Sequence, residues 1–368
     1  RDAELVMPAA TAPAFRHRPA FHHEDIELGR LVIRPIHTPG HTPEHTSYLL
    51  LVDDETVAVF SGGSLLVGSA GRSDLLGPER AETLARLQHG SVHRLARLPA
   101  HTSLYPTHGE GSFCTTSAAR RLDSTIGEEV KSNPVLAYGD EDAFVKGELS
   151  GLVPYPSYYH RMGPLNLVGL PEPRLEMPFL ATVPEGVTVV DARPMEHYAA
   201  GHLPGALGIE LRDSFGTWVG WLTEQDTPLA LVLEEGQDSE EAMRQLARVG
   251  YDDVRGVLRP SPAQRSRIAT VDLDGFVAGL EDDVQVLDVR APDEWEAGVV
   301  PDSILSYLPD LVVQTPAGLD RHRPVWVMCA SGLRAMTAAS ILEGRGFEPI
   351  VLVGAGATDV LARTSKQR

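Results

Sequence analysis

The chain has 368 residues, a length that favours two or three domains and excludes a single small module. Its composition, 42% hydrophobic and 23% charged, is typical of a folded soluble protein. A formal net charge of -19 disfavours binding to nucleic acid or to anionic membrane surfaces, and no apolar run approaches the roughly 18 residues of a membrane-spanning helix. Two cysteines form no disulfide framework, and we expect a protein of the reducing cytoplasm.

The first third of the chain is rich in histidine, and its polar segments follow apolar runs that are typical of strands. The predicted strands are residues 31–36, 47–52 and 57–60. The polar segments behind them contain His41, Gly63 and, further along, His108. Functional side chains are often carried by loops at strand ends, so these segments are candidate site residues.

An internal repeat follows residue 185. Asp191-Ala-Arg193 recurs as Asp288-Val-Arg290 at an offset of 97 residues, and later parts of the repeat return at an offset of 96. In each copy apolar runs alternate with helical patterns, which predicts two α/β domains with parallel sheets. The predicted strands of the repeat are residues 187–190, 229–233, 284–287 and 325–328. The predicted parts of the chain are a histidine-rich region at 1–150, a connector at 151–171, and two repeat copies at 172–262 and 263–368.

Cys329 stands between the predicted strand 325–328 and a helical pattern over residues 335–342. A loop that enters a helix directs several N–H groups and the positive end of the helix dipole at one point, and this favours an anion such as a thiolate. Arg334 adds a positive charge that can bind an anionic sulfur donor. The alternative interpretation of Cys329 is an inert buried thiol, the commoner role of a free cysteine.

The first copy lacks both groups. Leu233 stands at the position of Cys329, and Asp238 stands at the position of Arg334. Leucine has no sulfur chemistry, and the acidic side chain repels anionic donors. We therefore expect the first copy to be structural or to dock other domains.

The loop Cys329-Ala-Ser-Gly-Leu-Arg334, with the Asp-x-Arg and Gly-x-x-Pro signatures, resembles the active-site loop of the rhodanese family of sulfurtransferases. The resemblance implies a cysteine that takes the outer sulfur of thiosulfate or a persulfide and passes it to a nucleophile. It makes Cys329 and Arg334 the predicted catalytic residues. The predicted substrate-binding residues are those between them, Ala330, Ser331, Gly332 and Leu333.

The first region resembles the later half of a metallo-β-lactamase fold, and more closely its persulfide dioxygenase and glyoxalase II branch. The motifs are Thr38-Pro-Gly-His41, Ser61-Gly-Gly63 and Pro106-Thr-His108. The resemblance implies a partial αββα sandwich with His41 and His108 as metal ligands, for Fe(II) in a dioxygenase or Zn in a hydrolase. Gly63 stands where the family has an aspartate ligand, and only 40 residues precede His41, so we expect the first half of this domain to be missing from the sequence.

The leading hypothesis is sulfane-sulfur metabolism: a rhodanese-type sulfurtransferase acting through a Cys329 persulfide, coupled in the intact protein to a dioxygenase-like metal domain. One alternative is a Zn-dependent thioester or ester hydrolase of the glyoxalase II type. Another is a non-catalytic scaffold that relays sulfur or binds partners. The expected partner is a small-molecule persulfide or thiosulfate, and association into a homo-oligomer is left open.

Overall fold

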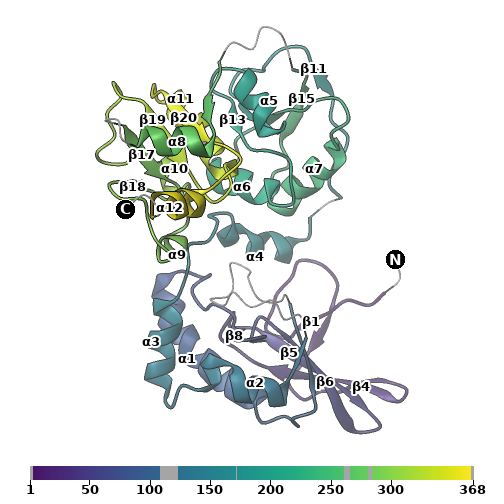
Figure 1. Ribbon diagram of the computed structural model, residues 1–368. Helices are drawn as coiled ribbons and strands as arrows, with labels where there is room; N and C mark the ends of the chain where they lie inside the picture. The colour runs from purple at the N-terminus through teal and green to yellow at the C-terminus, as the bar shows by residue number, and fades with distance from the viewer. Residues whose placement is uncertain (1–2, 108–122, 171, 261–265, 281–283, 366–368) are drawn as a thin grey trace. The chain divides into compact units, whose positions relative to one another are not determined.

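The computed structural model describes residues 3–107, 123–170, 172–260, 266–280 and 284–365. The chain divides into two compact units (Figure 1). Unit 1 comprises Arg1–Tyr155 and Tyr159–Leu170, and unit 2 comprises Pro156–Tyr158 and Pro171–Arg368. None of the helices within the described ranges is long and apolar enough to cross a membrane.

Unit 1 is built on a six-stranded sheet with the strand order β10-β9-β6-β5-β4-β3. Its strands are β3 (Ile26–Leu28), β4 (Leu31–His37), β5 (Thr46–Val52), β6 (Glu55–Gly62), β9 (Ser103–Pro106) and β10 (Ser124–Thr125). All neighbours are antiparallel except β6 and β9, which run parallel. Outside this sheet lie the pairs β1 (Val6–Pro8) with β2 (Arg18–Ala20) and β7 (Leu65–Leu66) with β8 (Ser69–Ala70). The three strands predicted in this region are confirmed as β4, β5 and β6.

The helices of unit 1 are α1 (Pro78–Leu95), α2 (Ile126–Ser132), a 3-10 turn η1 (Pro134–Leu136), α3 (Glu141–Ser150) and α4 (Tyr159–Val168). The apolar stripe of α1, which includes Val92 and Leu95, joins a core cluster with Leu49, Val59 and Leu104 of the sheet. Helix α4 lies within the segment predicted to be a connector.

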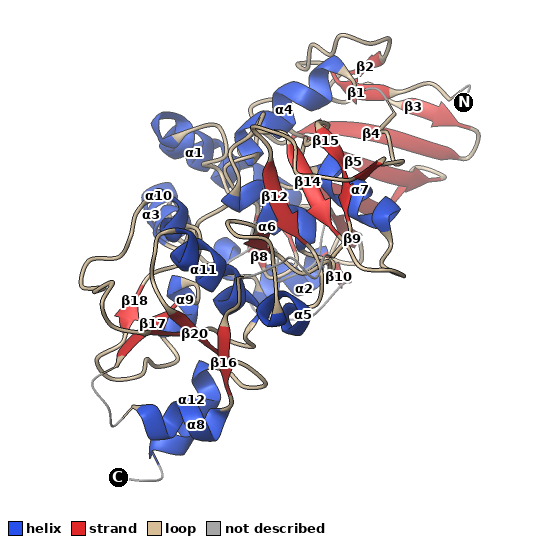
Figure 2. Ribbon diagram, turned by 90° about the horizontal axis from the view of Figure 1, so that it is seen from above, coloured by secondary structure: helices blue, strands red, loops and turns tan. Residues whose placement is uncertain are grey.

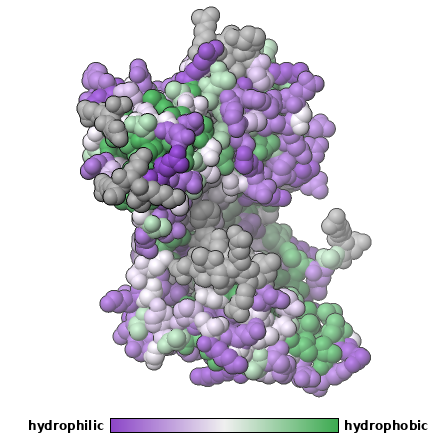
Figure 3. Space-filling view, in the orientation of Figure 1, coloured by the Kyte–Doolittle hydropathy of each residue, from purple (hydrophilic) through white to green (hydrophobic). Residues whose placement is uncertain are grey.

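Aromatic side chains remain exposed on the sheet of unit 1. Phe60 of β6 and Tyr105 of β9 are register partners, are 49% and 50% exposed, and stack with ring centroids 5.4 Å apart. Figure 3 shows apolar residues at the surface over the strands of unit 1. The sheet of unit 1 thus has one buried face and one partly exposed face.

Unit 2 contains two parallel five-stranded sheets of the same topology, β11-β15-β14-β12-β13 and β16-β20-β19-β17-β18 (Figure 2). The first sheet belongs to copy 1, whose elements are β11 (Phe179–Leu180), β12 (Thr188–Asp191), α5 (Met195–Ala200), β13 (Leu207–Gly208), α6 (Phe215–Leu222), β14 (Leu229–Val232), α7 (Ser239–Arg248) and β15 (Val254–Leu258). The elements of copy 2 are β16 (Ala269–Val271), α8 (Leu273–Gly279), β17 (Gln285–Asp288), α9 (Pro292–Trp295), β18 (Ile304–Leu305), α10 (Asp310–Val313), β19 (Val325–Met328), α11 (Leu333–Gly344), β20 (Pro349–Leu352) and α12 (Ala357–Ser365). The predicted repeat of a parallel α/β domain is confirmed.

The repeated Asp-x-Arg signature forms a buried ion pair in both copies. Asp191 and Arg193 are joined at 2.6 Å, and Asp288 and Arg290 at 2.7 Å, with both carboxylates fully buried. Each guanidinium also donates to the carbonyl of the signature glycine, Gly201 or Gly298, at 2.9 and 2.8 Å respectively. The signature therefore has a structural role, because it ties the end of a central strand to the loop after the next helix.

Candidate functional site

Cys329 follows β19 directly and lies in the turn that leads into α11. The residue is 1% exposed. Its Sγ accepts the backbone N–H groups of Gly332 and Ser331, with N···S distances of 3.1 and 3.5 Å. Two N–H groups and the start of a twelve-residue helix thus converge on one sulfur, an arrangement that stabilises negative charge there.

Two glycines allow the backbone to pack closely here: Gly332 lies in the turn, and Gly356 lies in the segment after β20. Gly332 caps α11 at φ 90°, where a side chain is strained, and a Cβ there would lie 3.0 Å from the carbonyl oxygen of Leu352. A Cβ on Gly356 would lie 2.0 Å from the carbonyl oxygen of Ala330. The N–H of Ala357 also donates to the carbonyl of Cys329 at 2.8 Å. The segment after β20 therefore holds the cysteine turn in place through close backbone contacts.

The four residues predicted to bind substrate differ in how exposed they are. Ala330 and Ser331 are exposed, Gly332 is buried, and Leu333 is half-buried. The outer side of the loop is therefore exposed at Ala330 and Ser331, whereas Cys329 itself is buried.

Arg334 is held by a carboxylate that sequence reasoning did not single out. Its Nη2 donates to Oε1 of Glu294 at 2.8 Å, and its Nη1 donates to Oε2 of the same carboxylate. Burial raises the pKa of Glu294, but the hydrogen bonds from Arg334 and the Ala291 N–H and the charges of Arg334 and Arg290 together outweigh burial, so the pKa lies below its usual value. Burial lowers the pKa of Arg334, but the hydrogen bond to Glu294 and the electrostatic contributions of the neighbouring groups together outweigh burial and raise the pKa. The pair is therefore ionised, and Glu294 compensates the charge that was predicted to bind an anionic donor.

A signal for Glu294 exists in the sequence. Its side chain accepts the N–H of Ala291 at 2.9 Å, so the segment Ala291-Pro-Asp-Glu294 has the spacing of a helix N-terminus. That spacing indicates where α9 begins. It does not indicate a contact with Arg334, which lies 40 residues away along the chain.

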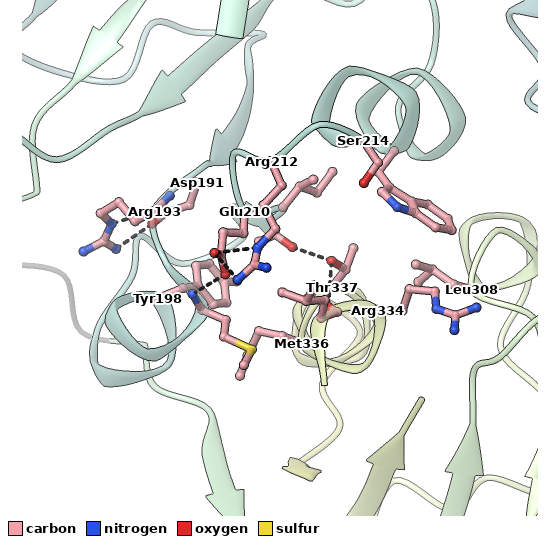
Figure 4. Close-up of a pocket in the computed structure, with 15 residues that line it drawn as sticks. Asp191, Arg193, Tyr198, Glu210, Arg212, Ser214, Leu308, Arg334, Met336 and Thr337 are labelled. Atoms are coloured by element: carbon pink, nitrogen blue, oxygen red, sulfur yellow. Dashed lines mark hydrogen bonds and ion pairs between the residues drawn. The ribbon is translucent and has the colours of Figure 1, made fainter. Parts of the chain in front are cut away.

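Beside α11 lies a small cavity that residues of both copies line (Figure 4). Copy 2 contributes Arg334, Met336 and Thr337, while copy 1 contributes Glu210 and Arg212, whose side chains form an ion pair at 2.8 Å. The lining given by the described residues does not include Cys329. The cavity therefore adjoins the helix that carries Arg334, and not the sulfur itself.

The matching turn of copy 1 keeps a glycine at positive φ, Gly236 at 93°, but has neither the cysteine nor the arginine. Leu233, at the position of Cys329, is buried in the core. Asp238, at the position of Arg334, caps α7 by accepting the N–H of Glu241 at 3.0 Å. Leu233 thus packs in the core of copy 1, and Asp238 caps a helix.

In unit 1, the histidines of the Pro-Gly-His segment pack against glycines. The Nδ1 of His41 donates to the carbonyl of Arg72 at 2.8 Å, because a carbonyl can only accept. The Nε2 of His45 accepts the N–H of Gly63 at 3.0 Å. Burial lowers the pKa of His45 to about 4, so its ring is neutral. Both imidazoles are thus fixed by backbone groups.

The metal site expected from the resemblance does not fit these residues. Gly63 offers no side-chain donor, and a Cβ at that position would lie 2.3 Å from Cδ2 of His41, so the histidine ring occupies the space of the expected carboxylate. Within the described ranges, no group of three or more His, Cys, Asp and Glu side chains is arranged to hold a metal ion. The second predicted ligand, His108, and the second cysteine, Cys114, lie outside the described residues. His41 is therefore the one predicted ligand whose place is described.

Comparison with known proteins identifies both parts of the chain. The sequence profile of the rhodanese-like domain matches residues 181–258 and 273–362. A hydroxyacylglutathione hydrolase-like protein of Mus musculus is 31% identical over 135 residues, which are 31% of this chain and 48% of the relative. The chain thus spans about half the length of the curated relative that it matches.

A solved structure matches across more of the chain. The metallo-beta-lactamase from Staphylococcus aureus subsp. aureus COL is similar with a TM-score of 0.61 and 29% identity, covering 67% of this chain and 72% of that one. The rhodanese-like domains connect the chain, in general terms, with sulfur metabolism. The chain is a fusion of a metallo-β-lactamase-fold region with two rhodanese-like domains.

Proposed function

We propose that the chain is a sulfurtransferase in which Cys329 carries the transferred sulfur. The observation that supports this most directly is the convergence of the Ser331 and Gly332 N–H groups on Sγ at the N-terminus of α11. An inert core thiol needs no such donors, whereas a thiolate is stabilised by them and is the reactive form of cysteine.

The first step loads the cysteine. The Cys329 thiolate attacks the outer sulfur of thiosulfate or of a small persulfide, and an S–S bond forms between Sγ and that sulfur. The S–S bond of the donor breaks, and its electron pair leaves on sulfite or on the thiolate of the donor. The loop amides then hold the terminal sulfur, which carries negative charge after this step.

The second step transfers the sulfur from Cys329 to an acceptor. A nucleophilic acceptor, such as a small thiolate, attacks the terminal sulfur of the Cys329 persulfide. The Sγ–S bond breaks, and Cys329 leaves as the thiolate with which the cycle began. The two steps balance without an external oxidant or reductant.

The proposal is tested by steady-state transfer of sulfur from thiosulfate to a thiol acceptor. We expect turnover by the full chain and a loss of at least about a hundredfold in Cys329→Ser, because a hydroxyl cannot carry sulfane sulfur. Leu233→Cys, which places a thiol at the matched position of copy 1 in the Cys329→Ser background, is expected not to restore turnover. Equal turnover by wild type and Cys329→Ser would contradict the proposal.

A second activity of unit 1, oxidation or hydrolysis at a metal as in the dioxygenase and glyoxalase II branch, has support from the similarity of the fold. The packing of His41 against Gly63 argues against it for the described residues. The alternative of a non-catalytic scaffold is favoured by Leu233 and Asp238 in copy 1. The retained turn around Cys329 in copy 2 opposes it.

A further inference from the structure

One face of α11, the helix that begins at the cysteine turn, binds copy 1 through three polar side chains spaced three residues apart. Thr337 Oγ1 donates to the carbonyl of Gly208 at 2.7 Å, and Ser340 Oγ accepts the N–H of the same glycine at 3.2 Å. Glu343 Oε2 lies 2.8 Å from Nε2 of His202. One of these bonds, that of Thr337, is drawn as a dashed line in Figure 4, where Thr337 is labelled.

The bonds to Gly208 complete the edge of a sheet. Gly208 belongs to β13, the edge strand of copy 1, whose outward N–H and C=O groups have no strand neighbour among the residues that the structure describes. Thr337 and Ser340 bond both groups and so take the place of a further strand. The position must be glycine, because a Cβ there would lie 2.9 Å from the ring of Tyr198. In copy 2 the corresponding edge residue, Leu305, is 41% exposed.

The bond to Glu343 comes from a fully buried imidazole. His202 is 0% exposed, and its ring stacks on Tyr198 with centroids 4.0 Å apart. Its Nδ1 bonds to the carbonyl of Tyr198 at 2.9 Å, while its Nε2 bonds to the Glu343 carboxylate. The Tyr198 carbonyl and the Glu343 carboxylate thus hold the histidine ring at both of its nitrogens.

The repeat itself shows that this contact is specific to the helix beside the cysteine. In α7 of copy 1, the positions of Thr337, Ser340 and Glu343 are taken by Glu241, Arg244 and Ala247. Glu241 and Arg244 form a pair at 3.5 Å with side chains 37% and 40% exposed. In copy 2, Val299 stands at the position of His202. The four residues of the contact are thus absent at the equivalent positions of the repeat.

We propose that copy 1, which has lost its own nucleophile, is a positioning element for Cys329. By holding Thr337, Ser340 and Glu343, it fixes the axis of α11 and with it the N–H groups of Ser331 and Gly332 that point at Sγ. The four contact residues are positioning residues, because none of them touches the sulfur. This inference rests on the proposed sulfur transfer at Cys329.

The test compares variants of the full chain that remove one hydrogen bond each. Thr337→Val keeps the shape of the side chain and removes its hydroxyl, whereas Thr337→Ser restores the hydroxyl. Glu343→Ala removes the acceptor for His202, and Glu343→Gln retains one. Arg244→Ala, at the position in copy 1 that matches Ser340, is the control on a solvated helix face.

Two quantities are measured: the rate at which thiosulfate loads Cys329, by mass spectrometry, and the pH dependence of Cys329 alkylation by iodoacetamide. We expect Thr337→Val and Glu343→Ala to slow loading about five- to tenfold and to shift the alkylation profile to higher pH, because misplaced amides stabilise the thiolate less well. Thr337→Ser and Glu343→Gln should recover most of the rate, and Arg244→Ala should match wild type.

Unchanged loading and an unchanged alkylation profile in both Thr337→Val and Glu343→Ala would overturn the inference while leaving the proposed function intact. Failure of wild-type Cys329 to load would instead overturn the proposed function. If Glu343→Ala does not fold, as judged by circular dichroism, the loading rates and alkylation profiles of Thr337→Val and Ser340→Ala test the inference instead. A loss of rate that Thr337→Ser does not recover would also count against positioning by the hydroxyl.

Discussion

Glu294 bonds both terminal nitrogens of Arg334 in the copy that carries Cys329. In copy 1, His197 stands at the position of Glu294, and its Nδ1 lies 2.6 Å from Oε2 of Glu234. The cation beside the cysteine turn is therefore part of an ion pair particular to copy 2. An anionic donor that binds Arg334 must compete with Glu294.

This competition predicts opposite effects of two substitutions. Glu294→Gln leaves Arg334 without its compensating charge and is expected to speed loading by thiosulfate, about three- to tenfold, since the donor is a dianion. Arg334→Gln is expected to slow it by at least as much. Loading rates with thiosulfate and with a glutathione persulfide measure the effect. A faster reaction in Arg334→Gln would mean that the guanidinium does not bind the donor.

Gly332→Ala tests the geometry of the turn. The positive φ and the carbonyl of Leu352 at 3.0 Å should reduce the free energy of unfolding by about 1–2 kcal/mol and displace an N–H from Sγ, with slower loading as the result. Gly236→Ala is the matched control, because Gly236 has φ 93° but no atom within 4 Å of the added Cβ. It should lose stability through strain and load normally. Equal loading in both variants would contradict the role given to the Gly332 amide.

Asp288→Asn should destabilise unit 2 by about 3 kcal/mol, because it leaves the buried cation of Arg290 without a counter-charge. Asp253→Asn removes the partner of Arg255 from a pair whose side chains are both 51% exposed, and it should cost less than about 1 kcal/mol. Urea unfolding followed by tryptophan fluorescence measures this, since all four tryptophans lie in unit 2. Similar midpoints for the two variants would show that the buried pair adds no stability.

Because His45 is buried, we expect the stability of unit 1 to decrease in acid. The pKa of this histidine in the folded chain is lowered from 6.5 to about 4 by burial, so below pH 6.5 the unfolded chain binds a proton that the folded chain does not. The stability of unit 1 should therefore be complete above pH 6.5 and should fall as the pH decreases toward 4. Proteolysis of unit 1 in urea, at a series of pH values, measures this stability. His45→Gln should flatten the dependence, whereas His101→Asn, at a 59% exposed side chain, should leave it unchanged.

Local patterns predicted much of the fold. The offset between Asp191 and Asp288 revealed the repeat, and the apolar runs at 31–36 and 325–328 became β4 and β19, because a buried strand needs a continuous or alternating apolar pattern. The sequence also placed Cys329 at a strand-to-helix turn. What it did not predict are contacts between distant residues.

Two contacts show the reason. His202 and Glu343 are 141 residues apart, and each is an ordinary polar residue in its own helix or loop. Only the docking of α11 against β13 brings them together, and no periodicity encodes that docking. Likewise, the absence of a carboxylate at Gly63 was visible in the sequence, but the histidine ring that fills its place was not.

The most direct test of the account is intact mass spectrometry of the full chain after exposure to thiosulfate and, separately, to a glutathione persulfide, with peptide mapping of any added sulfur. We expect a gain of one sulfur atom on the peptide that contains Cys329, its removal by a thiol acceptor, and no gain at this position in Cys329→Ser. Reduced and folded protein that gains no sulfur from either donor, or that gains it only at Cys114, would contradict the central claim.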